Sequence, residues 1–411
     1  MLDDSSDETR AIVDRVAAEL CERGHRISVL PRSDRRGFKA GALAAGLAQT
    51  EAEFVAIFDA DFVPPRNFLR HTLPFLLSDP RLGIVQARWG HLNAGESPLT
   101  RAQAIGIDGH FMVEQSARTF NGLFTNFNGT AGIWRRLAIA DAGGWSADTL
   151  TEDLDLSYRA QLAGWRAHFI AELEVPGELP GSLAAFKSQQ FRWAKGSIQS
   201  ARKLLPRIVK SDAPVWTKTQ AVLHLTHYVI HPLMLLVALL AWPVMVRFPL
   251  DTPTAWIVVL AALLALVVLA PNAVYLASQR ALHRDWWWRL RWLPVLTCLG
   301  IGLTVNNARA VLEGLFGKTG GEFVRTPKRG ESQRKRYRSA QVVAPWIEIA
   351  MGLYCAASLV SYLGTGRYAI GLFLVFYTMG FLSVGTLSVM EQYRMCRAPP
   401  LILAEAVAEE A

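Results

Sequence analysis

Residues 54–61 read FVAIFDAD, an apolar run followed by two aspartates, Asp59 and Asp61. The run has the length and composition of a buried strand, and the pair Pro64-Pro65 follows closely as a structure breaker. We therefore predict a parallel strand that presents both aspartates at its carboxyl end, where open α/β sheets bind ligands. Carboxylates at this spacing can hold a hard divalent cation together with diphosphate oxygens. The alternative is a solvated turn after a strand, and the motif alone leaves both interpretations open.

The sequence around this stretch, up to about Pro206, alternates helical patterns with short apolar runs. The pattern predicts helices over 7–20 and 39–49 and strands over 26–30 and 54–58. Such alternation is typical of an α/β domain in which helices connect the strands of a sheet.

The second half of the chain is strongly apolar, and 51% of all 411 residues are hydrophobic, which argues against a purely soluble protein. Runs long enough for a helix to cross a bilayer lie at 222–246, 256–277, 342–363 and 368–389. A fifth run at 292–305 is too short to cross easily and has basic residues on both sides, so we predict an interfacial or re-entrant segment. The chain should therefore combine an α/β domain with an α-helical multi-pass membrane region.

The net charge of +8 could indicate nucleic-acid binding, but much of the excess lies at 325–338, between two apolar runs. This placement is typical of a cytoplasmic loop, so we expect no nucleic-acid partner. The predicted organisation is a cytosolic α/β domain over 1–206, two membrane helices plus the interfacial stretch over 207–312, a basic cytosolic loop over 313–341, two membrane helices over 342–390 and a cytosolic tail over 391–411.

Polar residues near the start of the chain could bind a phosphorylated ligand. Asp3 and Asp4 come first, and Lys39 lies between two glycines at a predicted helix start. Lysine and backbone amides at a helix start suit phosphate. Helix capping and an ordinary glycine turn explain the same residues equally well.

Two later motifs could act on an acceptor. Asp153 follows Glu152 at the start of a helical pattern, where it could be a general base or serve the helix terminus. Trp193 lies with Gln189 and Arg192 on an amphipathic segment over 183–205. The indole could stack on a sugar ring while the polar pair bonds hydroxyls or phosphate, or the segment could be an interfacial helix with an aromatic anchor.

The order of the motifs Asp-Asp, Asp-x-Asp, Thr-Glu-Asp and Gln-x-x-Arg-Trp resembles the processive family 2 glycosyltransferases that include cellulose synthase. FNGTAGIWR at 127–135 and ELP at 178–180 are similar to the cellulose-synthase-like mannan and xyloglucan-backbone synthases. EFVRTPK at 322–328 resembles the gating loop that closes over the nucleotide in cellulose synthases. Family members begin with a membrane helix and a first strand that are missing here, so the resemblance implies an N-terminally truncated chain.

The resemblance implies a GT-A (Rossmann-like) glycosyltransferase domain followed by the membrane region. It implies an inverting, metal-dependent transfer of sugar from a nucleotide-sugar, UDP-glucose or GDP-mannose, to a growing β-linked polysaccharide, with β-1,4 linkage expected. The donor contacts that the resemblance implies are Asp3, Asp4, Lys39, Asp59, Thr326 and Lys328. The Mg²⁺ or Mn²⁺ ligands that it implies are Asp59 and Asp61.

On the acceptor side the resemblance implies that Asp153, with Glu152 beside it, takes the proton from the acceptor hydroxyl. The acceptor contacts that it implies are Asn128, Gly129, Thr130, Gln189, Arg192 and Trp193. It also implies a cell (inner) membrane enzyme whose catalytic domain is cytoplasmic and whose helices contact lipids. The alternative enzyme is a non-processive family 2 glycosyltransferase that forms a glycolipid. A transporter or scaffold would explain the membrane helices but not the acidic motifs.

Overall fold

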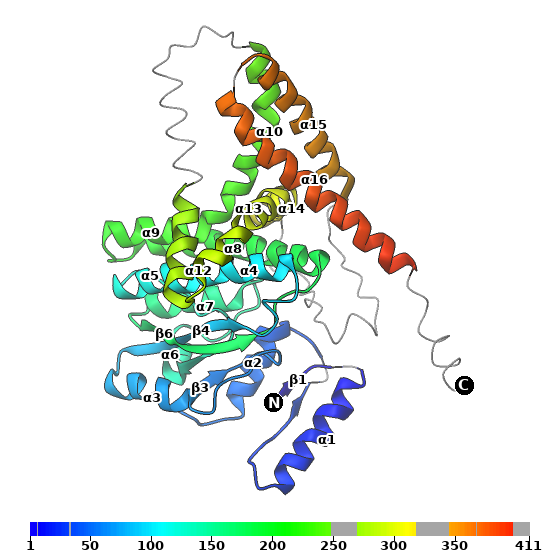
Figure 1. The fold of residues 1–411 in the computed structure, drawn as a ribbon. Helices are drawn as coiled ribbons and strands as arrows, with labels where there is room; N and C mark the ends of the chain where they lie inside the picture. The colour runs from blue at the N-terminus through cyan, green and yellow to red at the C-terminus, as the bar shows by residue number, and fades with distance from the viewer. Residues whose placement is uncertain (6, 33, 248–268, 318–344, 367, 398–411) are drawn as a thin grey trace, which may run out of the picture.

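The computed structural model describes residues 1–5, 7–32, 34–247, 269–317, 345–366 and 368–397. A sheet with flanking helices forms one end of the molecule, and apolar helices form the other (Figure 1). The α/β domain followed by helices that could span a membrane agrees with the fold class predicted from the sequence.

The central sheet has the strand order β3-β5-β4-β6, with bounds Phe54–Ile57, Gly132–Arg135, Leu82–His91 and Arg166–Gly177. β5 runs antiparallel to both β3 and β4, whereas β4 and β6 are parallel. The predicted parallel setting of β3 is therefore wrong: its ladder in the described residues is antiparallel. The reason is that β5 comes from a distant stretch of sequence, which the local apolar pattern of β3 does not reveal.

The first two strands are very short and pair with each other in a separate parallel sheet. They are β1 (Leu2–Asp3) and β2 (Leu30–Pro31). The strand predicted over 26–30 is thus reduced, among the described residues, to its last position and the proline after it. The expected helices are present, as α1 (Thr9–Glu22) and α2 (Phe38–Ala48).

Helices cover both faces of the central sheet. Neighbouring residues Ile133 and Trp134 of β5 point to opposite faces, and each belongs to a different buried cluster. The cluster around Ile133 includes Phe68 and Leu76 of α3 (Phe68–Ser78), and the cluster around Trp134 includes Leu156 of α7 (Glu152–Leu162). The remaining elements of this region are α4 (Pro98–Gly109), η1 (His110–Gln115), α5 (Ser116–Phe120) and α6 (Arg136–Asp141).

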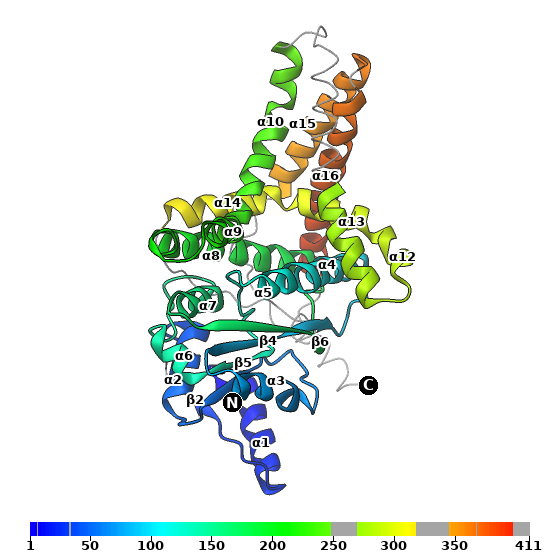
Figure 2. The ribbon, with the colours of Figure 1, turned by 90° about the vertical axis from the view of Figure 1, so that its left-hand side faces the viewer.

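A layer of helices lies between the sheet and the apolar bundle (Figure 2). It contains α8 (Leu183–Lys210), α9 (Val215–Thr226), η2 (His227–Val229), α13 (Leu293–Gly302) and α14 (Thr304–Phe316). The short α12 (Trp286–Arg289) and η3 (Leu290–Trp292) lead into α13. From this layer rise α10 (Ile230–Arg247), α15 (Pro345–Gly364) and α16 (Tyr368–Arg397).

Three stretches of helix among the described residues are long and apolar enough to cross a membrane: 215–244, 345–364 and 373–394. They correspond to three of the predicted runs, while most of the run at 256–277 lies outside the described residues. The run at 292–305 falls on two helices that bend by 45° at a break, a geometry shared by broken spans and re-entrant segments.

The apolar helices α15 and α16 hold α8 in place through buried polar contacts. Lys187 of α8 forms a fully buried ion pair with Glu348 of α15, at 2.6 Å between Nζ and Oε1. The carboxylate of Glu391 on α16 accepts from the first backbone amides of α8, those of Leu183 and Ala184, at 2.8 and 3.0 Å. A carboxylate at a helix N-terminus is favourable because it complements the helix dipole. These contacts fix the helix that carries Gln189, Arg192 and Trp193.

Candidate active site

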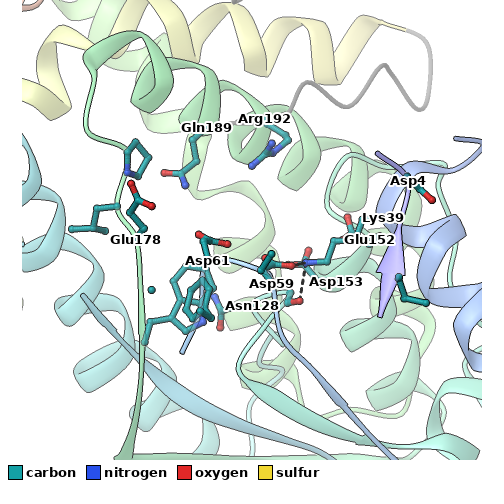
Figure 3. Close-up of a pocket in the computed structure, with 18 of the residues that line it drawn as sticks. Asp4, Lys39, Asp59, Asp61, Asn128, Glu152, Asp153, Glu178, Gln189 and Arg192 are labelled. Atoms are coloured by element: carbon teal, nitrogen blue, oxygen red, sulfur yellow. Dashed lines mark hydrogen bonds and ion pairs between the residues drawn. The ribbon is translucent and has the colours of Figure 1, made fainter. Parts of the chain in front are cut away.

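A cavity of about 490 Å³ opens where β3 ends, between the sheet and α8 (Figure 3). It brings together residues from widely separated parts of the sequence: Asp3, Asp4, Lys39, Asp59, Asp61, Asn128, Gly129, Glu152, Asp153, Gln189, Arg192 and Trp193. All were singled out from the sequence. Thr326 and Lys328, predicted to contact the donor, lie outside the described residues, as does the whole predicted gating segment 322–328.

Lys39 is the positive group beside the first aspartate of the motif. Its Nζ lies 2.6 Å from Oδ1 of Asp59 and donates to the backbone oxygen of Gly129 at 2.9 Å. Burial lowers the pKa of Lys39, but the nearby carboxylates of Asp59 and Glu152 raise it by more, so the net shift is upward. The ammonium therefore keeps its charge in this cavity.

Thr130 is buried beside the first aspartate of the motif. Its side chain is fully buried and does not line the cavity, and its hydroxyl accepts from the backbone amide of Asp59 at 2.9 Å. This contact holds the turn after β3, and a contact of Thr130 with the acceptor stays a prediction.

Asp59 and Asp61 offer oxygen ligands to a hard cation. Among the residues that the structure describes, no group of three or more His, Cys, Asp or Glu side chains could hold a metal by itself. Mg²⁺ is usually held by one or two carboxylates, with substrate phosphates and waters completing the shell. Two carboxylates facing a cavity that also contains Lys39 fit such a shared site.

The acidic pair Glu152 and Asp153 forms the first turn of α7. Thr151, the residue before them, makes no side-chain capping hydrogen bond. Burial and the neighbouring Glu152 raise the pKa of Asp153 to about 7, although Lys39 lowers it. Burial likewise raises the pKa of Glu152 against the opposing effect of Lys39. A carboxylate whose pKa lies near neutrality is suited to accept a proton. A role at the helix terminus alone would not require such a raised pKa.

Asp3 and Asp4 differ in how their carboxylates are bound. Asp4 pairs with Arg32, whose Nε donates to Asp4 Oδ1 at 2.8 Å. Oδ1 of Asp3 accepts from the backbone amide of Ser5 at 3.0 Å, whereas its Oδ2 is buried with no hydrogen-bond partner among the described residues. A buried acceptor of this kind is costly unless a ligand donates to it.

One face of α8 closes the cavity from the membrane side. Gln189, Arg192 and Trp193 line it, and the spacing of three and four residues puts them on the same helix face. In Figure 3, Gln189 and Arg192 extend from α8 toward the carboxylates. Burial lowers the pKa of Arg192, while Glu152, Asp153 and Asp59 raise it in part.

A second cavity, of about 430 Å³, shares part of its wall with the first. The shared residues include Trp89, Asn128, Asp153, Gln189 and Trp193. The rest of its wall comes from η1, α8 and the layer below the membrane helices, including His224 and Leu299. The two cavities together lead from the carboxylates toward the apolar half of the molecule.

Sequence reasoning did not find several residues of these cavities. Trp89 lies on β4 and lines both cavities, and His110 and Glu114 line the second. A histidine and a glutamate four residues apart in a helical pattern were the available signal, since such a pair shares a helix face.

Comparison with known proteins places these observations in a family. A family model described as "Glycosyltransferase like family 2" matches residues 1–196. The glucomannan 4-beta-mannosyltransferase 7 of Arabidopsis thaliana is 32% identical over 404 residues, which cover 94% of this chain and 70% of that protein. Glucomannan 4-beta-mannosyltransferase 9 of the same plant is 32% identical over 411 residues, covering 94% of this chain and 74% of that protein.

Among solved structures, the chain is similar to the mannosyltransferase PcManGT from Pyrobaculum calidifontis in complex with GDP-Man and Mn²⁺. The two are 19% identical, the match covers 76% of this chain and 75% of that one, and the TM-score is 0.47.

Proposed function

Because the chain belongs to the family 2 glycosyltransferases, together with cellulose-synthase-like glucomannan mannosyltransferases, we propose that it builds a β-1,4-linked polysaccharide by an inverting, metal-dependent transfer. The donor is GDP-mannose or UDP-glucose, and the names of the relatives favour mannose. The observation that carries the proposal is Asp153: a carboxylate whose pKa lies at about 7 faces the same cavity as Asp59, Asp61 and Lys39.

The donor binds in the part of the cavity that lies between the side chains of Asp3 and Lys39. The buried Oδ2 of Asp3 accepts from a ring N–H of the nucleobase, which guanine and uracil both possess. Lys39 contacts the diphosphate, and Asp59 with Asp61 would hold the divalent cation. When bound, the cation supplies counter-charge to the diphosphate.

The acceptor hydroxyl loses its proton to Asp153 as its oxygen attacks the anomeric carbon. The new carbon–oxygen bond forms on the face opposite the departing diphosphate, and the bond to the diphosphate breaks in the same displacement. One displacement converts an α-linked donor into a β-linked product. Lys39 stabilises the charge on the leaving group, and burial together with Glu152 keeps the pKa of Asp153 high enough for proton uptake.

The acceptor lies against the face of α8 that lines the cavity. Trp193 stacks on its terminal sugar, Gln189 and Arg192 bind its hydroxyls, and Asn128 lies at the junction of the two cavities. The second cavity supports a polymeric product, because it gives the sugars behind the acceptor end a path toward the membrane helices.

The excess of basic residues at 325–338 in the sequence supports a cytoplasmic placement of the sheet domain. In this placement the apolar helices span the cell membrane and contact lipid.

The test is to incubate membranes containing the protein with radiolabelled GDP-mannose or UDP-glucose and Mg²⁺ or Mn²⁺. We expect label in an ethanol-insoluble product that an endo-β-1,4-mannanase or an endo-β-1,4-glucanase releases. Label that extracts into organic solvent would instead identify a glycolipid-forming enzyme, and the absence of transfer from both donors would refute the proposal.

A further inference from the structure

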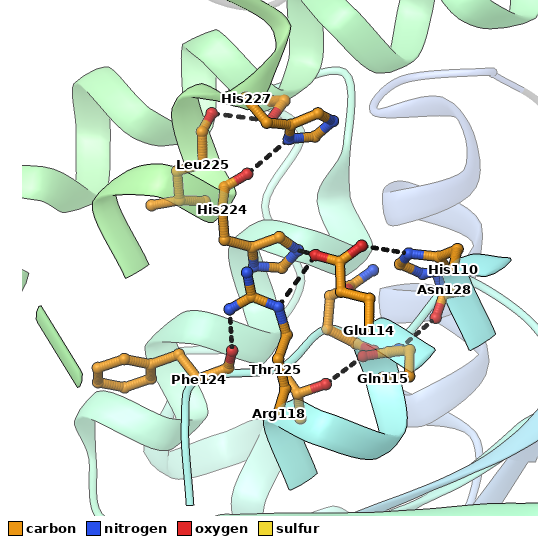
Figure 4. Close-up of polar contacts among 12 residues, drawn as sticks. His110, Glu114, Gln115, Arg118, Phe124, Thr125, Asn128, His224, Leu225 and His227 are labelled. Carbon is orange, nitrogen blue, oxygen red and sulfur yellow. Dashed lines mark hydrogen bonds and ion pairs between the residues drawn. The ribbon is translucent and has the colours of Figure 1, made fainter. Parts of the chain in front are cut away.

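The polar cluster around Glu114 has no part in the reaction described so far. Glu114 lies on η1 with His110 and Gln115, in a π-helical turn between α4 and α5 (Figure 4). Single π-helical turns within longer helices occur frequently at functional sites. Here the turn adjoins Asn128, one of the residues that line both cavities.

The contacts of Gln115 determine how the Asn128 amide is oriented. Nε2 of Gln115 donates to the backbone oxygen of Asn126 at 2.7 Å, so this end of Gln115 is the NH₂ group. The same nitrogen lies 2.7 Å from Oδ1 of Asn128. The NH₂ end of Asn128 therefore faces the other way, toward Nε2 of His110 at 3.1 Å.

This orientation fixes the tautomer of His110. Nε2 must accept from the Asn128 amide, so the imidazole proton is on Nδ1, which lies 2.9 Å from Oε2 of Glu114. Burial raises the pKa of Glu114, but the hydrogen bond from His110 and the nearby guanidinium of Arg118 bring it well below its ordinary value. An ionised carboxylate can only accept, and it therefore selects the Nδ1–H form of His110.

We propose that Glu114, acting through His110, and Gln115 are positioning residues that hold the Asn128 amide against the acceptor beside Asp153. The inference rests on the proposed function. The role of Glu114, His110 and Gln115 follows from their hydrogen bonds to one another and to Asn128. The backbone amide of Asn128 is held as well, by Oε1 of Gln86 at 3.0 Å. One N–H and one oxygen lone pair of the Asn128 side chain remain available to bind a sugar hydroxyl.

A double-mutant cycle tests the tautomer argument, with the full chain in membranes, GDP-mannose as donor and β-1,4-linked mannotetraose as acceptor. In Glu114→Gln the new amide can donate to Nδ1, which permits the other tautomer and turns an N–H of His110 toward the Asn128 NH₂ group. We expect kcat/KM for mannotetraose to fall about tenfold while KM for GDP-mannose changes by less than about twofold.

The second background is His110→Gln, in which an amide oxygen can accept from Asn128 and there is no tautomer to select. Glu114→Gln should change kcat/KM for mannotetraose by less than about twofold in that background. An equal loss in both backgrounds would overturn the inference, because Glu114 would then act through its contacts with Arg118 and His224. A loss confined to KM for GDP-mannose would overturn it too.

Failure of the proposed function can be distinguished from failure of the inference about Asn128. If the wild type transfers sugar from neither GDP-mannose nor UDP-glucose, the proposed function is refuted and the inference falls with it. If the wild type prefers UDP-glucose, the same cycle is run with UDP-glucose as donor and cellotetraose as acceptor. The same outcomes then support or overturn the inference. A wild type that transfers, combined with an additive cycle, refutes the inference alone.

Discussion

Gly129 leaves the space that the carboxylate of Asp153 occupies: a Cβ at position 129 would lie 2.8 Å from Asp153 Oδ2. The same Cβ would lie 3.4 Å from Nζ of Lys39. The backbone at Gly129 has a φ of +82°, a region that residues with a Cβ rarely adopt. Both the conformation and the close approach therefore require glycine at the junction of the proposed base and the diphosphate contact.

Gly129→Ala should lower the transfer rate by about tenfold or more, because it displaces Asp153 as well as straining the backbone. Gly144→Ala is the matched control, since Gly144 has a φ of +74° and a Cβ added there would meet nothing within 4 Å among the described residues. The control should lose thermal stability to a similar extent yet keep its transfer rate. Equal rate losses in the two variants would show that backbone strain alone is responsible.

Asp61→Asn should abolish the stimulation by Mn²⁺ or Mg²⁺ and lower transfer by about a hundredfold, because a hard cation would lose a charged ligand. EDTA should stop the wild-type enzyme, and added metal should restore it. Asp14→Asn, on the exposed surface of α1, is the control and should respond to metal as the wild type does. Full activity of the wild type in excess EDTA would contradict the metal role.

The acceptor kcat/KM should rise with pH up to about pH 7 and then level off, because only ionised Asp153 can take the proton and its pKa is about 7. Since this pKa is raised above that of the unfolded chain, the group's contribution to stability is lost as the pH rises through about 7. Asp153→Asn should therefore gain thermal stability relative to wild type at about pH 8, and less at about pH 5. A rate profile that is flat between about pH 5.5 and 8 would contradict the assignment.

Lys187→Met should destabilise the protein by about 3–5 kcal/mol, because it leaves Glu348 buried without its cation. Lys187→Met combined with Glu348→Leu should recover most of that loss, since the pair is replaced by apolar side chains. Thermal denaturation in detergent measures both. If the single variant were as stable as the wild type, α8 would not depend on this contact for its position.

The local sequence was sufficient to predict the helices and strands near the site, because each has a strong hydrophobic pattern of its own. The apolar run at 54–58 became β3, and Asp59 follows it as predicted. The helix predicted over 39–49 became α2, with Lys39 in its first turn. The order of the motifs along the chain resembles that of the family and pointed to Asp153 and Trp193. Both residues line the same cavity.

Long-range pairings could not be read in this way. The antiparallel partner of β3 is some 75 residues away in the sequence, at Gly132–Arg135, and no local periodicity encodes that choice. The contacts Lys187–Glu348 and Glu114–His110–Asn128 similarly depend on which helices pack together. The burial of the Thr130 side chain, between neighbours that line the cavity, could not be predicted from the motif either.

The most direct test of the account is the transfer rate of Asp153→Asn compared with wild type, at saturating GDP-mannose or UDP-glucose, with donor affinity measured on the same preparations. The variant removes a proton acceptor without removing a phosphate or metal contact. The account predicts a loss of about a thousandfold or more in transfer with donor affinity nearly unchanged. A variant that retains more than about a tenth of the wild-type rate would contradict the proposal that Asp153 is the base.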